Sequence, residues 1–176
     1  DIFFAVADNT TEGITASGGS GNDLLIGSNN YDTLQGLGGD DEIQGGDGDD
    51  TIEGGDGDDI LYGGDGIDRI LGGEGKDTIF GGIGDDYIYA HSSTYDWYNQ
   101  YPLGLVTDWS NVSYQDIIYG GEGNDNLRGF AASIMYGEEG DDYISSENMV
   151  EGATAYGGIG DDDINLTAPD IVDGGD

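Results

Sequence analysis

The chain has 176 residues, of which 38 are acidic and 3 are basic, and its formal net charge is −35. This charge excludes nucleic acid as a partner, because phosphate binding needs clustered Lys and Arg, and an anionic membrane surface would repel the chain. Only 35% of the residues are hydrophobic, 36 are glycine and none is cysteine, so the chain is predicted to be disordered unless something external, most simply a bound metal, neutralises its carboxylates.

Residues 1–17 fit no repeat and are expected to cap the first coil of the region that follows. Ile2, Phe4 and Val6 alternate as the residues of a strand do. The apolar stretch 2–7 is too short for a signal peptide and lacks a basic flank, and no apolar run approaches the length of a membrane helix. Because the chain starts without Met and ends partway into a repeat, we expect it to be a piece of a longer protein or a processed one.

Residues 18–89 fall into eight consecutive blocks of nine, for example GGDGDDILY at 54–62. The block at 27–35 is degenerate, with Ser28 and Asn30 at glycine positions. All eight blocks keep Asp at the sixth position and an apolar residue at the eighth, namely Leu25, Leu34, Ile43, Ile52, Leu61, Ile70, Ile79 and Ile88. A flexible glycine-rich linker would not place an aliphatic residue at every ninth position, so a repeating ordered structure is predicted.

Each position of the repeat has a physical reason. Glycines at the first, second and fourth positions allow a tight turn with positive φ, and the sixth-position carboxylate is a hard oxygen ligand suited to Ca²⁺. The last three residues form a short strand whose middle side chain points to the core. Two blocks then make one coil, and successive coils stack as parallel strands about 4.8 Å apart, which predicts an all-β solenoid with two sheets.

The turns alternate between two edges of this solenoid. Edge A holds the turns that start at residues 18, 36, 54 and 72, and edge B holds those that start at 27, 45, 63 and 81. Residues 90–119 interrupt the next edge-A turn as a long aromatic insertion that contains Trp97 and Trp109 and ends in a half repeat. This segment is predicted to contact a glycan or a protein, or else to fold its rings back onto the roll as a satellite core.

Residues 120–176 are expected to continue the roll with calcium turns on edge B alone. Glycine turns start at residues 120, 137, 157 and 174, at intervals close to one coil. The stretches between them lack the glycine turn, but each places an apolar residue where the core is expected, namely Met135, Ala155 and Val172. Edge A is therefore predicted to lose its calcium sites beyond the insertion.

The nonapeptide resembles the RTX repeat of secreted bacterial toxins, proteases, lipases, epimerases and adhesins. The resemblance covers residues 18–89 without a gap and most of 111–176, and it implies a right-handed parallel β-roll with about 8–10 Ca²⁺ ions between turns of adjacent coils. It also implies export through a type I secretion channel and folding outside the cell. The expected ligands are Asp23, Asp41, Asp59 and Asp77 on edge A and Asp50, Asp68, Asp86, Asp125, Asp142 and Asp162 on edge B, with Asp32 left open.

Three functions follow from this sequence as alternatives. The chain is a structural module whose folding is driven by calcium, or a segment of an adhesin, filament or surface layer that uses residues 90–119 for contact or assembles head to tail, or the repeat tail of an exported enzyme whose catalytic domain lies elsewhere. No Ser-His-Asp spacing, Cys nucleophile or His-rich zinc motif occurs in the chain, so it is not predicted to be an enzyme itself.

Overall fold

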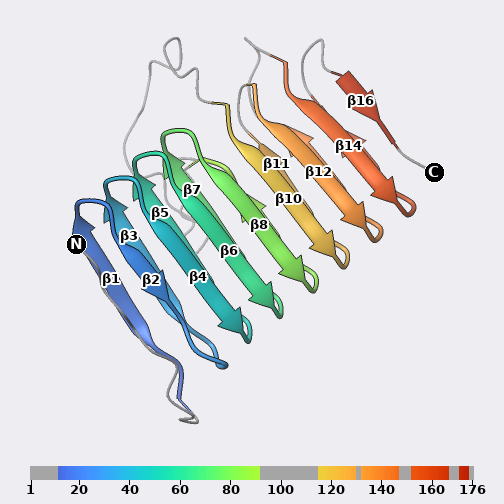
Figure 1. Ribbon diagram of the computed structural model, residues 1–176. Helices are drawn as coiled ribbons and strands as arrows, with labels where there is room; N and C mark the ends of the chain where they lie inside the picture. The colour runs from blue at the N-terminus through green and yellow to red at the C-terminus, as the bar shows by residue number, and fades with distance from the viewer. Residues whose placement is uncertain (1–11, 92–114, 130–131, 147–151, 167–170, 175–176) are drawn as a thin grey trace, which may run out of the picture.

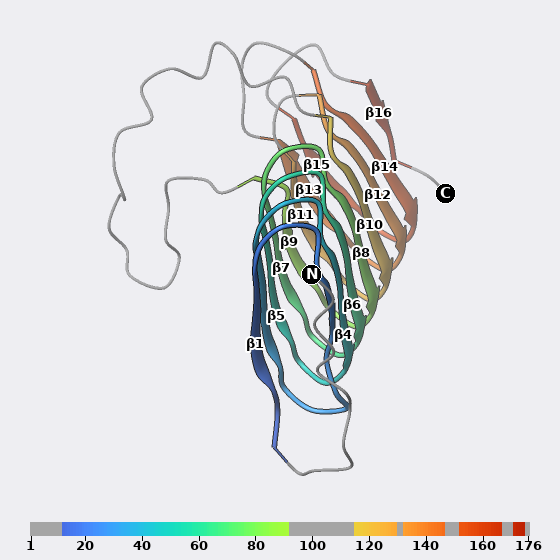
Figure 2. The ribbon, with the colours of Figure 1, turned by 60° about the vertical axis from the view of Figure 1, so that its left-hand side comes forward.

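The computed structural model describes residues 12–91, 115–129, 132–146, 152–166 and 171–174, which form sixteen β-strands and no helix. The strands lie in two parallel sheets that face each other, as the all-β prediction requires (Figures 1 and 2). No helix in this part of the chain could span a membrane.

The strands alternate between the two sheets along the chain. The odd sheet contains, in spatial order, β1 (Thr15–Ser20), β3 (Thr33–Gly38), β5 (Thr51–Asp56), β7 (Arg69–Glu74), β9 (Tyr87–Tyr89), β11 (Asn126–Gly129), β13 (Tyr143–Ser146) and β15 (Asp163–Asn165). The even sheet contains β2 (Leu24–Ile26), β4 (Glu42–Asp47), β6 (Ile60–Asp65), β8 (Thr78–Ile83), β10 (Ile117–Glu122), β12 (Ile134–Glu139), β14 (Thr154–Ile159) and β16 (Ile171–Asp173).

The register places equivalent repeat positions next to each other. Ile52 of β5 lies beside Ile70 of β7, which lies beside Ile88 of β9. Across the insertion, Gly82 of β8 lies beside Gly121 of β10, so the turns that start at 81 and 120 are direct neighbours. This confirms the prediction that the chain leaves the stack after β9 and returns to it in register at β10.

The eighth-position ladder forms the core, as predicted. All eight of these aliphatic residues from Leu25 to Ile88 are at most 1% exposed. Met135 and Ala155 continue the same column and are fully buried. Val172 pairs in register with Ala155 but is 54% exposed, so its predicted place in the core is wrong: β16 is the last strand of its sheet, and no described strand covers it.

The first coil begins earlier than the first full nonapeptide. Thr15 and Ala16 of β1 pair with Thr33 and Leu34 of β3, so the strand part of a repeat precedes Gly18. Residues 2–6 and both tryptophans lie outside the described residues, and the predictions of a capping strand and of a packed aromatic insertion remain predictions.

Two different constraints explain the glycines of the turns. At the second and fourth positions φ is positive, as at Gly46 (120°) and Gly48 (115°), where only glycine is free of strain. The first-position glycines do not share this conformation, which corrects the expectation for that position. Gly45 is needed for space instead, because a Cβ there would overlap Oδ2 of Asp50 and the carbonyl oxygen of Gly63.

Candidate metal centre

The sixth-position aspartates form two straight columns, one along each edge of the roll. The edge-A column contains Asp23, Asp41, Asp59 and Asp77, and the edge-B column contains Asp32, Asp50, Asp68, Asp86, Asp125, Asp142 and Asp162. All of them except the half-buried Asp162 are at most 5% exposed. The structure therefore brings every predicted ligand onto the expected edge and buries all of them except Asp162 inside the turn.

In every aspartate of the two columns except Asp23, one carboxylate oxygen accepts a backbone N–H of the preceding coil. Asp68 Oδ1 accepts the N–H of Asp50 at 2.8 Å, and Asp86 Oδ1 accepts the N–H of Asp68 at 2.8 Å. The pattern crosses the insertion without interruption, since Asp125 Oδ1 accepts the N–H of Asp86 at 2.8 Å. This ladder fixes the carboxylates in position and leaves their second oxygen for another partner.

That second oxygen has no protein partner in nine of the turns. The buried Oδ2 atoms without a hydrogen bond among the described residues belong to Asp41, Asp50, Asp59, Asp68, Asp77, Asp86, Asp125, Asp142 and Asp162. A buried carboxylate oxygen without a partner is costly, because its charge has lost water and gained nothing. These nine atoms are the observation that a bound cation would explain.

Each such Oδ2 atom lies beside the first-position glycine of its turn, close to a backbone carbonyl oxygen of the next coil, and we call this pair of oxygens a cradle. A Cβ added to Gly54 would overlap Asp59 Oδ2 and lie 2.6 Å from the carbonyl oxygen of Gly72 in the next coil. The same arrangement recurs at Gly63, with Asp68 Oδ2 and the carbonyl of Gly81. Only a hard cation prefers carboxylate and carbonyl oxygens together, so the donor set fits Ca²⁺.

Backbone carbonyls must supply most of the ligands. Among the described residues, no three acidic or histidine side chains converge on one point. A calcium ion needs six to eight oxygens, so one carboxylate per turn has to be supplemented by carbonyl groups of the two adjacent turns, and by water.

Burial raises the pKa of these carboxyl groups strongly. Loss of water is the largest cause, and it raises the pKa of Asp77 and Asp86 to about 8 and that of Asp50 and Asp125 to about 7. The hydrogen bond from the neighbouring backbone N–H partly opposes this shift, and the neighbouring carboxylates of the column add to it. In the folded roll at neutral pH, an ionised carboxylate at these positions is therefore unfavourable unless it binds a proton or a cation.

Asp32, which the sequence left open, differs from the rest of its column. Its Oδ1 accepts the hydroxyl of Ser28 at 3.0 Å and the N–H of Ile14 at 2.5 Å, and its Oδ2 accepts the N–H of Ser28. Ser28 stands at a glycine position of the degenerate block, and its backbone N–H and its hydroxyl together give both carboxylate oxygens of Asp32 a protein partner. We therefore do not place a cation at Asp32.

Asp116 is a member of the edge-A column that sequence analysis missed. It is 3% exposed, and its Oδ1 accepts the N–H of Asp77 at 3.0 Å across the insertion. Its position in the half repeat, two residues before Ile118, was the available signal.

The edge-A column contains no further aspartate directly after Asp116, because Ser133 and Ala153 occupy the next two places. The Ser133 hydroxyl donates to Asp116 Oδ2 at 3.4 Å. Edge A thus carries a serine and an alanine where aspartates would stand, and the loss of calcium sites beyond residue 129 remains a prediction.

A second ladder, also missed, runs along the exposed fifth positions. Asp58 Oδ1 accepts the N–H of Lys76 at 2.9 Å, and Asp49 Oδ1 accepts the N–H of Ile67 at 2.9 Å. Here the acceptor lies one coil before the donor, whereas in the sixth-position ladder it lies one coil after. The Asp-Asp and Asn-Asp pairs of the repeat thus tie each turn to both of its neighbours.

The raised pKa values predict how the calcium-free roll responds to pH. Because the folded carboxyls bind protons more tightly than unfolded ones, whose pKa is near 4, folding without calcium is favoured at low pH and this contribution is lost between about pH 4 and pH 8. In chelator, circular dichroism should therefore show more β-structure at about pH 5.5 than at pH 8. When calcium is present at a limiting concentration, more β-structure is expected at pH 8 than at about pH 5.5, because protons compete with calcium for the same carboxylate oxygens.

Charge repulsion alone would give the same trend, so the control is salt at pH 8. Concentrated NaCl screens repulsion between exposed carboxylates but does not protonate buried ones. A chelated chain that folds fully in NaCl at pH 8 would contradict a role for the buried groups.

Two columns of buried carboxylates along the turns of a parallel β-solenoid define a cation-binding repeat protein. The chain belongs to the RTX calcium-binding nonapeptide repeat family, whose profile matches residues 17–52, 35–70, 62–92, 113–130 and 129–148, more than half of the sequence. No curated protein gives a significant match to the chain.

Proposed function

We propose that this chain is a structural module that binds several calcium ions and folds in response to extracellular calcium. The observation that carries the proposal is the set of nine buried Oδ2 atoms that have no hydrogen-bond partner in the described part of the chain. The chain has only three basic residues for its 38 acidic ones, so side chains cannot neutralise these columns. Bound calcium would supply the missing positive charge, and the aspartates and turn carbonyls would hold it.

Folding and cation binding are then one process. The cradles exist only when adjacent coils are stacked, so the unfolded chain has no preformed site and binding free energy becomes folding free energy. Such coupling suits a protein that crosses a secretion channel unfolded and meets millimolar calcium outside the cell. Membership of a family typical of secreted proteins supports this localisation.

The experiment compares two aspartates of one turn. Asp59 is 1% exposed in the column, whereas Asp56 is an exposed residue of the same turn. Asp59→Asn should lower the number of bound ions measured by equilibrium dialysis and raise the calcium midpoint of folding. Asp56→Asn removes the same charge and should leave both quantities close to those of the wild type. Equal effects of the two variants would contradict specific sites.

The other two candidate functions, an adhesin or filament segment and the repeat tail of an exported enzyme, depend mainly on residues outside the described ones. An adhesin or filament segment that makes contact through residues 90–119 depends on 92–114, and an enzyme would need a catalytic domain beyond this chain. Head-to-tail assembly is tested by light scattering in calcium, where a strictly monomeric protein would argue against it.

A further inference from the structure

A continuous row of aromatic rings lies on the outer face of the even sheet. Tyr62, Phe80, Tyr119, Tyr136 and Tyr156 occupy equivalent positions on the neighbouring strands β6, β8, β10, β12 and β14, and the rings of adjacent residues are 4.9 Å apart with planes within 7° of each other. Parallel rings in contact are about 3.5 Å apart between planes, so a centroid distance of 4.9 Å requires them to be slipped. Each ring therefore leaves part of its face uncovered.

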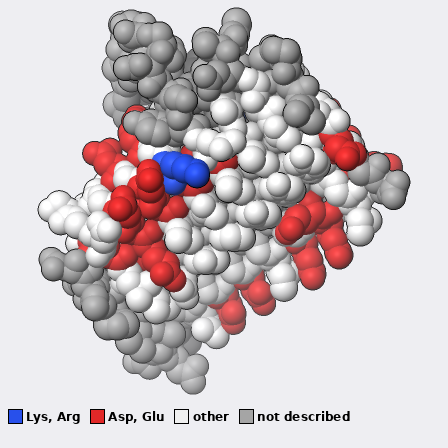
Figure 3. All heavy atoms as spheres, turned by 45° about the horizontal axis from the view of Figure 1, so that its top comes forward, with Lys and Arg blue, Asp and Glu red and all other residues white. Residues whose placement is uncertain are grey.

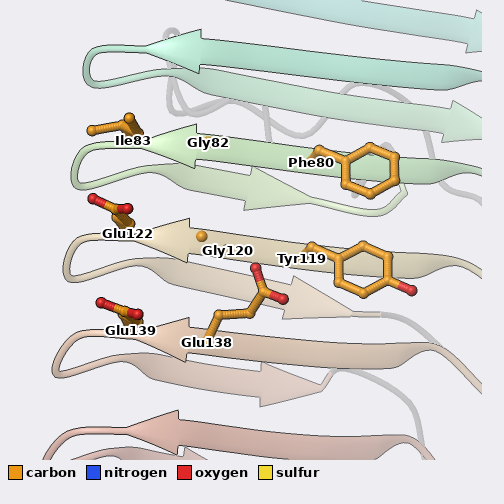
Figure 4. A pocket seen from close by; sticks show the side chains of 9 residues that line it. Phe80, Gly82, Ile83, Tyr119, Gly120, Glu122, Glu138 and Glu139 are labelled. Carbon is orange, nitrogen blue, oxygen red and sulfur yellow. The ribbon is translucent and has the colours of Figure 1, made fainter.

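A groove lies beside the middle of this row, over β8, β10 and β12. One wall is formed by the rings of Phe80 and Tyr119, and Figure 4 shows these rings with their faces turned outward. The opposite wall consists of third-position side chains, among them Ile83, Glu122 and Glu139. The floor on β8 and β10 is glycine, including Gly82 and Gly121, so these two strands place no side chain between the walls. The two walls are three residues apart along the strand, which makes the groove about 10 Å wide.

Glu138 interrupts the glycine floor and adds a carboxylate to the groove. Its φ is 81°, in the left-handed region that disfavours a side chain, whereas Gly82, Gly121 and Gly158 occupy the same column on β8, β10 and β14. Figure 4 shows its side chain reaching from β12 over the floor of β10, between Tyr119 and Glu122. Unfavourable backbone conformations of this kind concentrate at functional sites.

The charged side chains around the groove restrict which ligands can bind in it. Figure 3 shows a broad uncharged area with acidic side chains gathered at its margins and one small basic cluster beside them. The three charged groups that line the groove, Glu122, Glu138 and Glu139, are all acidic. Polyanions are therefore repelled, and so is a second copy of this chain, which would bring the same acidic margin.

We propose that this groove binds a strand of a neutral polysaccharide that lies along the roll axis. Sugar rings stack their C–H faces on uncovered aromatic faces, which carry negative partial charge. Sugar hydroxyls can donate hydrogen bonds to Glu122, Glu138 and Glu139, and bonds to an ionised acceptor are the strong ones. The row of rings is straight and evenly spaced, as a linear polymer of identical units requires.

An extended peptide fits less well. The usual way for a peptide to bind a sheet is to pair with an unpaired strand. Here β8 pairs with β6 and β10, and β10 pairs with β8 and β12, so the strands beneath the groove have no free edge. A buried peptide backbone would be left without hydrogen-bond partners.

Affinity electrophoresis of the full, calcium-loaded chain tests the proposal, with hydroxyethyl cellulose, xylan and a soluble β-1,3-glucan as probes. At least one neutral probe should retard the wild type. The double variant Phe80→Thr, Tyr119→Thr should bind about tenfold more weakly, because two ring faces are lost. The control is Tyr87→Thr, which removes a 41% exposed tyrosine from the odd sheet and should bind as the wild type does. Circular dichroism in calcium verifies that each variant is folded.

A second pair of variants keeps the test valid if the double variant fails to fold. Glu138→Gly and Leu37→Gly each replace a residue at positive φ, 81° and 83°, so neither should harm folding. Only Glu138→Gly should weaken binding, since Leu37 lies on the odd sheet. The proposal is overturned if no neutral probe retards the wild type, if Tyr87→Thr weakens binding as much as the double variant, or if only chitosan or polylysine binds and added salt abolishes that binding.

Discussion

Chelation of calcium at neutral pH should unfold the whole β-roll. The nine Oδ2 atoms without partners are buried, and removal of a carboxylate from water costs several kcal/mol unless an opposite charge compensates it. Domains of this size are stable by only about 5–15 kcal/mol, so even a few uncompensated carboxylates exceed the available stability. Circular dichroism should show disorder in chelator and β-structure in calcium, with a midpoint of about 10⁻⁴–10⁻³ M, the range of extracellular calcium modules.

Two controls separate coordination from simple screening. Mg²⁺ should substitute poorly, because it demands a smaller and more rigid octahedron and gives up its water reluctantly. NaCl at matched ionic strength should also fail, since it offers no ion that the cradles hold. A chelated protein with an unchanged β-sheet spectrum would contradict the expectation.

Ile70→Asp should prevent folding even in saturating calcium. Ile70 is 1% exposed and packs in register between Ile52 and Ile88. The substitution removes a side chain worth about 2–5 kcal/mol in packing and buries a carboxylate where the adjacent side chains are aliphatic, which costs several kcal/mol more. Ile70→Val removes one methyl group and should cost only about 1 kcal/mol. Calcium titrations followed by circular dichroism measure both variants.

The matched control is Ile67→Asp, three residues earlier. Ile67 is 46% exposed at the fifth position of its turn, where other repeats carry an Asp or Asn that accepts an N–H of the next coil. The introduced carboxylate would offer that acceptor to the N–H of Asp85, so Ile67→Asp should fold as the wild type does although it adds the same charge. If Ile70→Asp folds normally, or if both variants fail equally, the assignment of the eighth position to the core is wrong.

The nonapeptide itself determined the fold class, the core and the two columns of aspartates. A block of nine contains its whole turn and its whole strand, so the places of its sixth and eighth residues are set locally. Stacking of identical blocks then repeats those roles, and this is why Ile52, Ile70 and Asp68 were placed correctly without a structure. The one-sided loss of aspartates could be predicted for the same reason, because the edges alternate with the blocks.

The tertiary structure decided everything that depends on which coils are neighbours. Asp116 joins Asp77 across 39 residues of chain, and Asp32 is satisfied by Ser28, and neither relation follows from the period. The ring row on the even sheet also became visible only in the stack, because Phe80 and Tyr119 are separated by the insertion and yet lie 4.9 Å apart. The physical reason is that the contacts between coils depend on the register with which the chain returns after residue 114, and that register comes from packing and ladder pairing rather than from any local sequence preference.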